Sequence, residues 1–225
     1  MPFPRPVAAV VFDMDGLLID TETLWRDGMI GEAEALGLDL PLEAFKRLIG
    51  SPAARTRQML LEHFGADFDV DGYLDGARRR FDGALDFETL LKAGVTELLD
   101  QLDALGLPRA IATSSGPEAV RRHLEPIGLL ARFQAVISRD RYAEAKPAPD
   151  AFLTAAAALG VAPEACLALE DSHTGVRAAH AAGMMTVMVP DLLEPNEEMH
   201  EKCVHVVGSL HAVAAMLGRG AAAAP

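Results

Sequence analysis

The sequence predicts an α/β protein with a doubly wound parallel sheet and an inserted all-helical cap. From residue 95 onward, short apolar runs of strand length alternate with helical patterns, which is typical of a parallel sheet covered by helices. A first apolar run, residues 7–12, is separated from the others by residues 21–87, where every pattern is helical. We therefore expect a core of residues 1–16 and 88–218, a helical cap at 17–87, and a disordered tail at 219–225.

Composition restricts the partners that this chain is expected to have. At 225 residues it is long enough for one core with an insertion. Its net charge of −13 argues against nucleic acid or an anionic membrane as partner. The two cysteines, Cys166 and Cys203, suggest no disulfide framework, and neither a signal peptide nor an 18-residue apolar run is evident. We expect a cytoplasmic protein, a monomer or weak homodimer, that captures anionic ligands through local positive groups.

The cap elements follow from apolar stripes at helical spacing. The first helix is expected to begin at an N-cap Thr21, to carry Glu22 in its first turn, and to end at Gly37. Further segments are expected at residues 42–49 and from about 50 to 64. A last stripe predicts a helix before Phe87; it consists of Leu74, Ala77, Phe81 and Leu85.

The core elements then alternate along the chain. Apolar residues that recur every three or four positions indicate helices, and short continuous apolar runs indicate buried strands. The expected strands after the first are residues 109–113, 134–138, 166–169, 185–189 and, at an edge, 204–207. The expected helices are residues 95–105, 120–127, 150–159, 174–182 and 210–217.

The first strand ends abruptly in Asp13-Met14-Asp15-Gly16. Ligands of open α/β sheets bind beyond the carboxyl ends of the strands, and two neighbouring carboxylates repel each other unless a cation or proton separates them. Oxygen ligands favour Mg²⁺; a calcium loop would need a different glycine position and a preceding helix. The alternative is that one aspartate caps the next helix and the other is solvated.

Polar residues also follow three later strands. Thr113-Ser114-Ser115-Gly116 places hydroxyls before a helix N-terminus, a phosphate-holding arrangement, although Ser115 could be only an N-cap. Lys146 precedes a stiff Pro147-Ala148-Pro149 segment, although a lysine in such a place, taken alone, is more often a surface residue. Glu170-Asp171 is a second acidic pair directly after an apolar run. Together they predict one site at one edge of the sheet.

These residues resemble the four ordered motifs of the haloacid dehalogenase superfamily. The motifs are Asp13-Met14-Asp15-Gly16, Thr113-Ser114, Lys146-Pro147 and Glu170-Asp171, and the similarity extends from about residue 8 to 190. The resemblance implies a Rossmann-like core with a small helical cap inserted after the first motif. The second aspartate, Asp15, is similar to that of the phosphatase and phosphotransferase members.

The resemblance also implies roles for these residues. Asp13 would attack phosphorus and form an aspartyl-phosphate, and Asp15 would act as general acid and then general base. Mg²⁺ would be held by the Asp13 carboxylate, the Asp15 backbone carbonyl and Asp171, with Glu170 as a ligand or an outer partner. Thr113 and Ser114 would hold phosphoryl oxygens, and Lys146 would neutralise charge.

The expected function is Mg²⁺-dependent hydrolysis of a small phosphomonoester, a sugar, polyol or nucleoside phosphate. A β-phosphoglucomutase-like enzyme is the alternative, but its cap histidine corresponds here to Trp25 and its cap arginine to Ala53, with Arg55 close by. A phosphoacceptor receiver module is a different-class alternative, and it would lack the helical insertion. Residues expected to contact substrate from the cap are Glu22, Trp25, Arg55 and Arg57.

Overall fold

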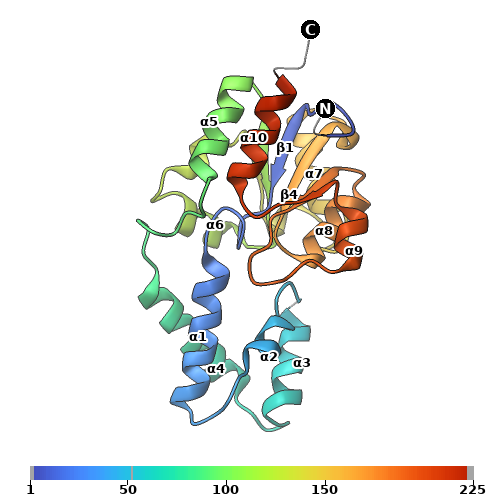
Figure 1. Cartoon of the computed structure of the whole chain (residues 1–225). Helices are drawn as coiled ribbons and strands as arrows, with labels where there is room; N and C mark the ends of the chain where they lie inside the picture. Colours follow the sequence, from blue (N-terminus) through green and yellow to red (C-terminus); the bar gives the residue numbers. More distant parts are fainter. Residues whose placement is uncertain (1–2, 52, 222–225) are drawn as a thin grey trace. The chain divides into compact units, whose positions relative to one another are not determined.

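The chain folds into two compact units (Figure 1). The computed structural model describes residues 3–51 and 53–221. The core unit comprises the chain up to Ile19 and from Phe87 onward, and the helical unit is Asp20–Asp86. Among the described residues, no helix is both long and apolar enough to cross a lipid bilayer.

The core unit contains a six-stranded sheet of order β3-β2-β1-β4-β5-β6, in which every neighbouring pair is parallel. The strands are β1 (Ala9–Phe12), β2 (Arg109–Ala112), β3 (Ala135–Ile137), β4 (Cys166–Glu170), β5 (Met185–Met188) and β6 (His205–Val206). The predicted α/β class is confirmed, and the segment predicted as an edge strand lies at the β6 edge. From β1 the chain first adds strands on one side of the sheet (β2, β3) and then on the other side (β4, β5, β6). Open α/β sheets form their ligand crevice at such a change of side, here between β1 and β4.

Helices connect and cover the strands. In the core unit they are α5 (Val95–Leu105), α6 (Pro117–Leu124), α7 (Asp150–Leu159), α8 (His173–Ala181), α9 (Glu197–Lys202) and α10 (Leu210–Ala221). Three short 3-10 helices, Leu129–Arg132, Arg139–Arg141 and Pro163–Ala165, complete the connections. α10 extends into the segment predicted as a disordered tail, of which residues 222–225 lie outside the described residues.

One face of the sheet is built from small side chains, and α7 packs closely against it. Ala110 and Ala112 of β2 are fully buried in one cluster with Ala151, Phe152 and residues of β1 and β4. Small residues let a helix backbone approach the strands, and close packing of such interiors leaves few voids. Because α7 begins only four residues after Lys146, its docking positions the loop that carries this lysine.

The helical unit consists of α1 (Thr21–Ala35), α2 (Leu42–Lys46), α3 (Ala53–Phe64) and α4 (Val70–Ala84). Thr21 is already the first residue of α1, preceded by Asp20, so the predicted Thr21 cap is wrong by one position. α1 packs along α4, where the buried Tyr73 hydroxyl donates to the Met29 carbonyl oxygen at 2.7 Å. The aromatic ring of Trp25 contacts that of Phe81 edge-on, with centroids 6.1 Å apart.

Gly28 should be required for the close crossing of α1 and α4. A Cβ at Gly28 would lie 2.7 Å from the Ala77 carbonyl oxygen, so Gly28→Ala must push the helices apart and should destabilise the helical unit by about 1–3 kcal/mol. Urea denaturation followed by the fluorescence of Trp25, the only tryptophan, would report on this unit.

Gly31→Ala is the matched control on the same helix. The nearest atom to its added Cβ would be Arg80 Cδ at 3.6 Å, an ordinary contact. The higher helix propensity of alanine should therefore stabilise the unit by up to about 1 kcal/mol. Equal stability changes in the two variants would show that the crossing does not depend on Gly28.

Candidate active site

The polar strand ends predicted from the sequence meet at one edge of the sheet. Register pairs Phe12 with Ile111 on one side and with Leu169 on the other. The residue after each therefore lies at the same level, and Asp13 is flanked by Ala112 and Glu170. The Asp13 backbone N–H donates to the Leu169 carbonyl oxygen at 3.0 Å, which fixes where the side chain begins.

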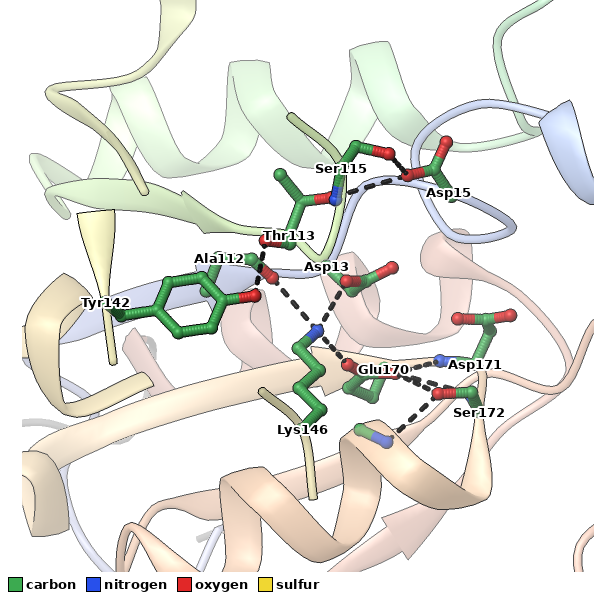
Figure 2. A network of polar contacts seen from close by, with 11 residues as sticks. Asp13, Asp15, Ala112, Thr113, Ser115, Tyr142, Lys146, Glu170, Asp171 and Ser172 are labelled. Atoms are coloured by element: carbon green, nitrogen blue, oxygen red, sulfur yellow. Dashed lines mark hydrogen bonds and ion pairs between the residues drawn. The ribbon is translucent and has the colours of Figure 1, made fainter. Parts of the chain in front are cut away.

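Lys146 lies at the centre of this group (Figure 2). Its Nζ donates to Asp13 Oδ1 at 2.6 Å, to Glu170 Oε1 at 2.6 Å and to the Ala112 carbonyl oxygen at 3.0 Å. All three ammonium hydrogens are thus used. The alternative of a surface lysine is excluded, since Lys146 is only 7% exposed.

The charges in this network reinforce one another. Burial lowers the pKa of Lys146, but the carboxylates of Asp13 and Glu170 outweigh burial and raise that pKa above its ordinary value, so the lysine stays protonated. Burial is also the largest influence on Asp13 and raises its pKa well above the ordinary range. Lys146 lowers the pKa of Asp13, whereas Glu170 and Asp15 raise it. A further cation beside Asp13 would favour its ionised form.

Glu170 is held on both carboxylate oxygens. Oε1 accepts from Lys146, and Oε2 accepts from the backbone N–H groups of Asp171 and Ser172 and from the Ser172 hydroxyl, at 3.1 to 3.3 Å. Ser172 in turn caps α8, because its Oγ accepts from the Gly175 backbone N–H. The fully buried Glu170 therefore joins the lysine to the start of α8.

Asp15 points toward a different set of groups. Its Oδ2 accepts from the Ser115 hydroxyl at 2.7 Å and from the Thr113 hydroxyl at 3.3 Å (Figure 2). The N-cap of α6 is Gly116, so interpreting Ser115 as an N-cap is wrong. Sequence reasoning missed the contact of Ser115 with Asp15, and the run of hydroxyl residues was the only signal that could have suggested it.

Tyr142, which the sequence analysis did not single out, holds the loop after β2 by a hydrogen bond. The buried Tyr142 hydroxyl donates to the Thr113 carbonyl oxygen at 3.0 Å (Figure 2). The Thr113 hydroxyl also accepts from the Ser115 backbone N–H at 3.0 Å. Ser114, by contrast, is exposed. The loop is thus a rigid turn with one hydroxyl residue presented outward.

The donor set of this site fits a divalent cation. Oxygens of Asp13, Glu170 and Asp171 lie within 4.8 Å of one another, and all three residues are buried. Clustered buried carboxylates repel, and hard oxygen ligands suit Mg²⁺. The Asp15 carboxylate is not part of this cluster and accepts from the Thr113 and Ser115 hydroxyls instead.

The four residues predicted to contact substrate from the cap lie in the helical unit. Arg57 makes a two-pronged ion pair with Asp71, with N–O distances of 2.6 and 2.5 Å, which joins α3 to α4. Arg55 pairs with Glu62 at 3.3 Å along α3, and Glu22 lies in the first turn of α1. The Arg78 guanidinium lies 5.7 Å from the centre of the Trp25 ring. These contacts give Trp25 and Arg57 structural roles; recognition of substrate by any of the four stays a prediction.

Comparison with known proteins identifies relatives over most of the chain. A family model for haloacid dehalogenase-like hydrolases matches residues 7–183. The Bacillus subtilis protein YhcW is 37% identical over 82% of this chain and 84% of its own. The fructose-1-phosphate phosphatase YqaB of Escherichia coli is 34% identical over 81% of this chain and 96% of its own. The crystal structure of CbbY from Rhodobacter sphaeroides in complex with phosphate superposes with a TM-score of 0.70 at 25% identity, covering 91% and 95% of the two chains.

Gly175 should be needed to keep Glu170 and Lys146 in place. A Cβ at Gly175 would fall 1.8 Å from Glu170 Oε1, and this carboxylate cannot move away without breaking its four hydrogen bonds. We expect Gly175→Ala to destabilise folding by about 1–3 kcal/mol in thermal denaturation. Gly208→Ala, whose added Cβ meets nothing within 4 Å, is the control and should melt like the parent.

Proposed function

The chain belongs to the haloacid dehalogenase-like hydrolase family and is a phosphatase, and on this basis we propose that it is a Mg²⁺-dependent phosphomonoesterase that works through an aspartyl-phosphate. The observation that carries the proposal is the division of two aspartates from one strand end into two environments. Asp13 faces a buried ammonium and an acidic cluster, whereas Asp15 faces two hydroxyls.

In the first half of the reaction, an Asp13 carboxylate oxygen attacks phosphorus, the bond from phosphorus to the alcohol oxygen breaks, and Asp15 gives its proton to that oxygen. Water then attacks the phosphorus of the aspartyl-phosphate and gives a proton to Asp15. Inorganic phosphate leaves and the Asp13 carboxylate is restored. The Ser115 hydroxyl supports this because it donates to Asp15 Oδ2 at 2.7 Å and so holds the Asp15 carboxyl in one orientation through both steps.

Lys146 keeps the nucleophile oriented and adds positive charge where anionic oxygens gather. Its ion pair with Glu170 holds the ammonium there, so we assign Glu170 as the group that positions the lysine. The proposed donors to phosphoryl oxygens are the Thr113 hydroxyl and the backbone N–H of Ser114, which is an exposed residue. Phosphoryl transfer depends mainly on such positioning and electrostatic stabilisation.

The proposed holders of Mg²⁺ are the carboxylates of Asp13 and Asp171 and the backbone carbonyl oxygen of Asp15. When bound, the ion supplies positive charge that neutralises phosphoryl oxygens and orients them for in-line attack. The donor set supports this because its carboxylates are buried together and are only partly balanced by Lys146.

The proposed substrate is a small phosphorylated sugar, polyol or nucleoside. YqaB, which matches over 81% of this chain, is named a fructose-1-phosphate phosphatase. Because the chain has a net charge of −13, an anionic substrate gains little from the overall field and depends on local groups. A screen of phosphorylated metabolites that releases inorganic phosphate would identify the preferred class.

We expect Asp13→Asn to abolish hydrolysis of p-nitrophenyl phosphate, because an amide oxygen is too weak a nucleophile. The parent protein should require Mg²⁺ and lose its activity in excess EDTA. Asp27→Asn, which removes an exposed carboxylate of α1, is the matched control and should retain full activity. Turnover by Asp13→Asn at the parent's rate would contradict the assignment.

Asp15→Asn should reduce kcat for an alkyl phosphate about 10²–10⁴-fold, the usual contribution of general acid–base catalysis. p-Nitrophenolate leaves without a proton, so this substrate should give a rapid burst followed by slow turnover, since loss of the base leaves the aspartyl-phosphate intact. Stopped-flow absorbance measures both phases. Turnover of this substrate at the parent's rate would contradict the general-base role of Asp15 in the second step.

The mutase alternative is tested on the same protein. A sugar-phosphate mutase would return phosphate to the sugar and release little inorganic phosphate when glucose 1-phosphate and a catalytic hexose bisphosphate are supplied. We expect net release of inorganic phosphate, in keeping with Trp25 and Ala53 at the positions where the mutases carry histidine and arginine.

A further inference from the structure

Asp191 lies beyond β5, at the same edge of the sheet as the candidate site. Its side chain is nine-tenths buried, and its two oxygens have different surroundings. Oδ1 accepts from Lys92 Nζ at 2.5 Å. Oδ2 is also buried, yet it accepts no hydrogen bond from any residue that the structure describes. One half of this carboxylate is therefore held by the protein and the other half is not.

The Oδ2 atom of Asp191 faces the acidic cluster across Gly16. A Cβ built on Gly16 would lie 3.3 Å from Asp191 Oδ2 and 2.4 Å from Asp171 Oδ2. Gly16 also has a φ of +82°, which L residues with side chains rarely adopt. The glycine thus leaves space in which the carboxylates of Asp171, directly after β4, and Asp191, beyond β5, converge.

Two converging buried carboxylates need a positive partner between them. Lys92 Nζ contacts Asp191 at Oδ1, whereas Oδ2 has no hydrogen-bond partner among the described residues. An anchoring role for the Lys92–Asp191 ion pair would explain the contact that Oδ1 makes. The Lys92 backbone N–H donates to the Leu18 carbonyl oxygen, which joins the two chain segments that lead to the helical unit. Anchoring does not explain why Oδ2 is buried toward Asp171.

We propose that Asp191 is a positioning residue of the metal site, whose Oδ2 accepts hydrogen bonds from water bound to the cation that Asp13 and Asp171 hold. This inference rests on the Mg²⁺ dependence in the proposed function. Mg²⁺ sheds its water reluctantly and keeps several water ligands in proteins. Outer carboxylates that orient such ligands typically contribute 10- to 100-fold in metal affinity.

Isothermal titration of the metal-free protein with MgCl₂ measures this contribution directly, without catalysis. We expect Asp191→Asn to bind Mg²⁺ at least 10-fold more weakly than the parent. Asp103→Asn is the matched control, because Asp103 is also a carboxylate paired with basic side chains, Arg109 and Arg132, but lies outside the acidic cluster. It should bind Mg²⁺ as the parent does. Circular dichroism in EDTA verifies that each variant is folded.

Lys92→Gln separates the proposed role from anchoring. If Asp191 served only to hold Lys92, then Lys92→Gln and Asp191→Asn would weaken Mg²⁺ binding equally, and the inference would be overturned. We expect Lys92→Gln to keep or increase Mg²⁺ affinity, because the Asp191 carboxylate remains. If Asp191→Asn does not fold, Lys92→Gln alone decides: a 10-fold loss overturns the inference and unchanged affinity supports it.

The parent protein distinguishes failure of this inference from failure of the proposed function. If the parent binds no Mg²⁺, the metal dependence itself is wrong. If the parent and Asp191→Asn bind Mg²⁺ equally, only the role of Asp191 is wrong.

Discussion

The ammonium of Lys146, buried between the carboxylates of Asp13 and Glu170, is the interaction on which the site depends. Removing each ion from water costs several kcal/mol, and the cost is recovered only when geometry and hydrogen bonding are good. Here both distances are 2.6 Å, the Ala112 carbonyl oxygen takes the third hydrogen, and Glu170 is held by the start of α8. Removal of Lys146 would leave two buried carboxylates without the cation that they share.

The scaffold makes this arrangement possible through strand order and small residues. β1 and β4 pair in parallel at the middle of the sheet, so their last residues end at one level. Ala110 and Ala112 allow α7 to dock closely and carry the lysine loop into place. Gly175 leaves room for the Glu170 carboxylate. The chemistry of the site thus constrains residues that have no polar side chain.

The site concentrates negative charge in a chain that is already acidic. Asp13, Glu170 and Asp171 lie together, and Asp191 approaches Asp171 across Gly16, with Lys146 and Lys92 each occupied by a carboxylate. Such an arrangement suits a divalent cation that also binds a phosphate dianion, because the cation then compensates protein and substrate at once. The Thr113 and Ser115 hydroxyls donate to the Asp15 carboxylate, in keeping with the proton exchange that we propose for it.

The sequence alone determined the parallel α/β fold, the helical insertion, and the meeting of Asp13, Thr113, Lys146 and Glu170 at one edge. Strand and helix periodicities are local, and the carboxyl ends of parallel strands share an edge whatever their order. The tertiary structure decided what each side chain contacts. Ser115 binds Asp15 instead of capping α6, Tyr142 supports the Thr113 loop, and Asp191 turns toward Asp171. These pairings join residues up to 100 positions apart, and they follow from strand register and from the glycines that leave space, neither of which a local pattern encodes.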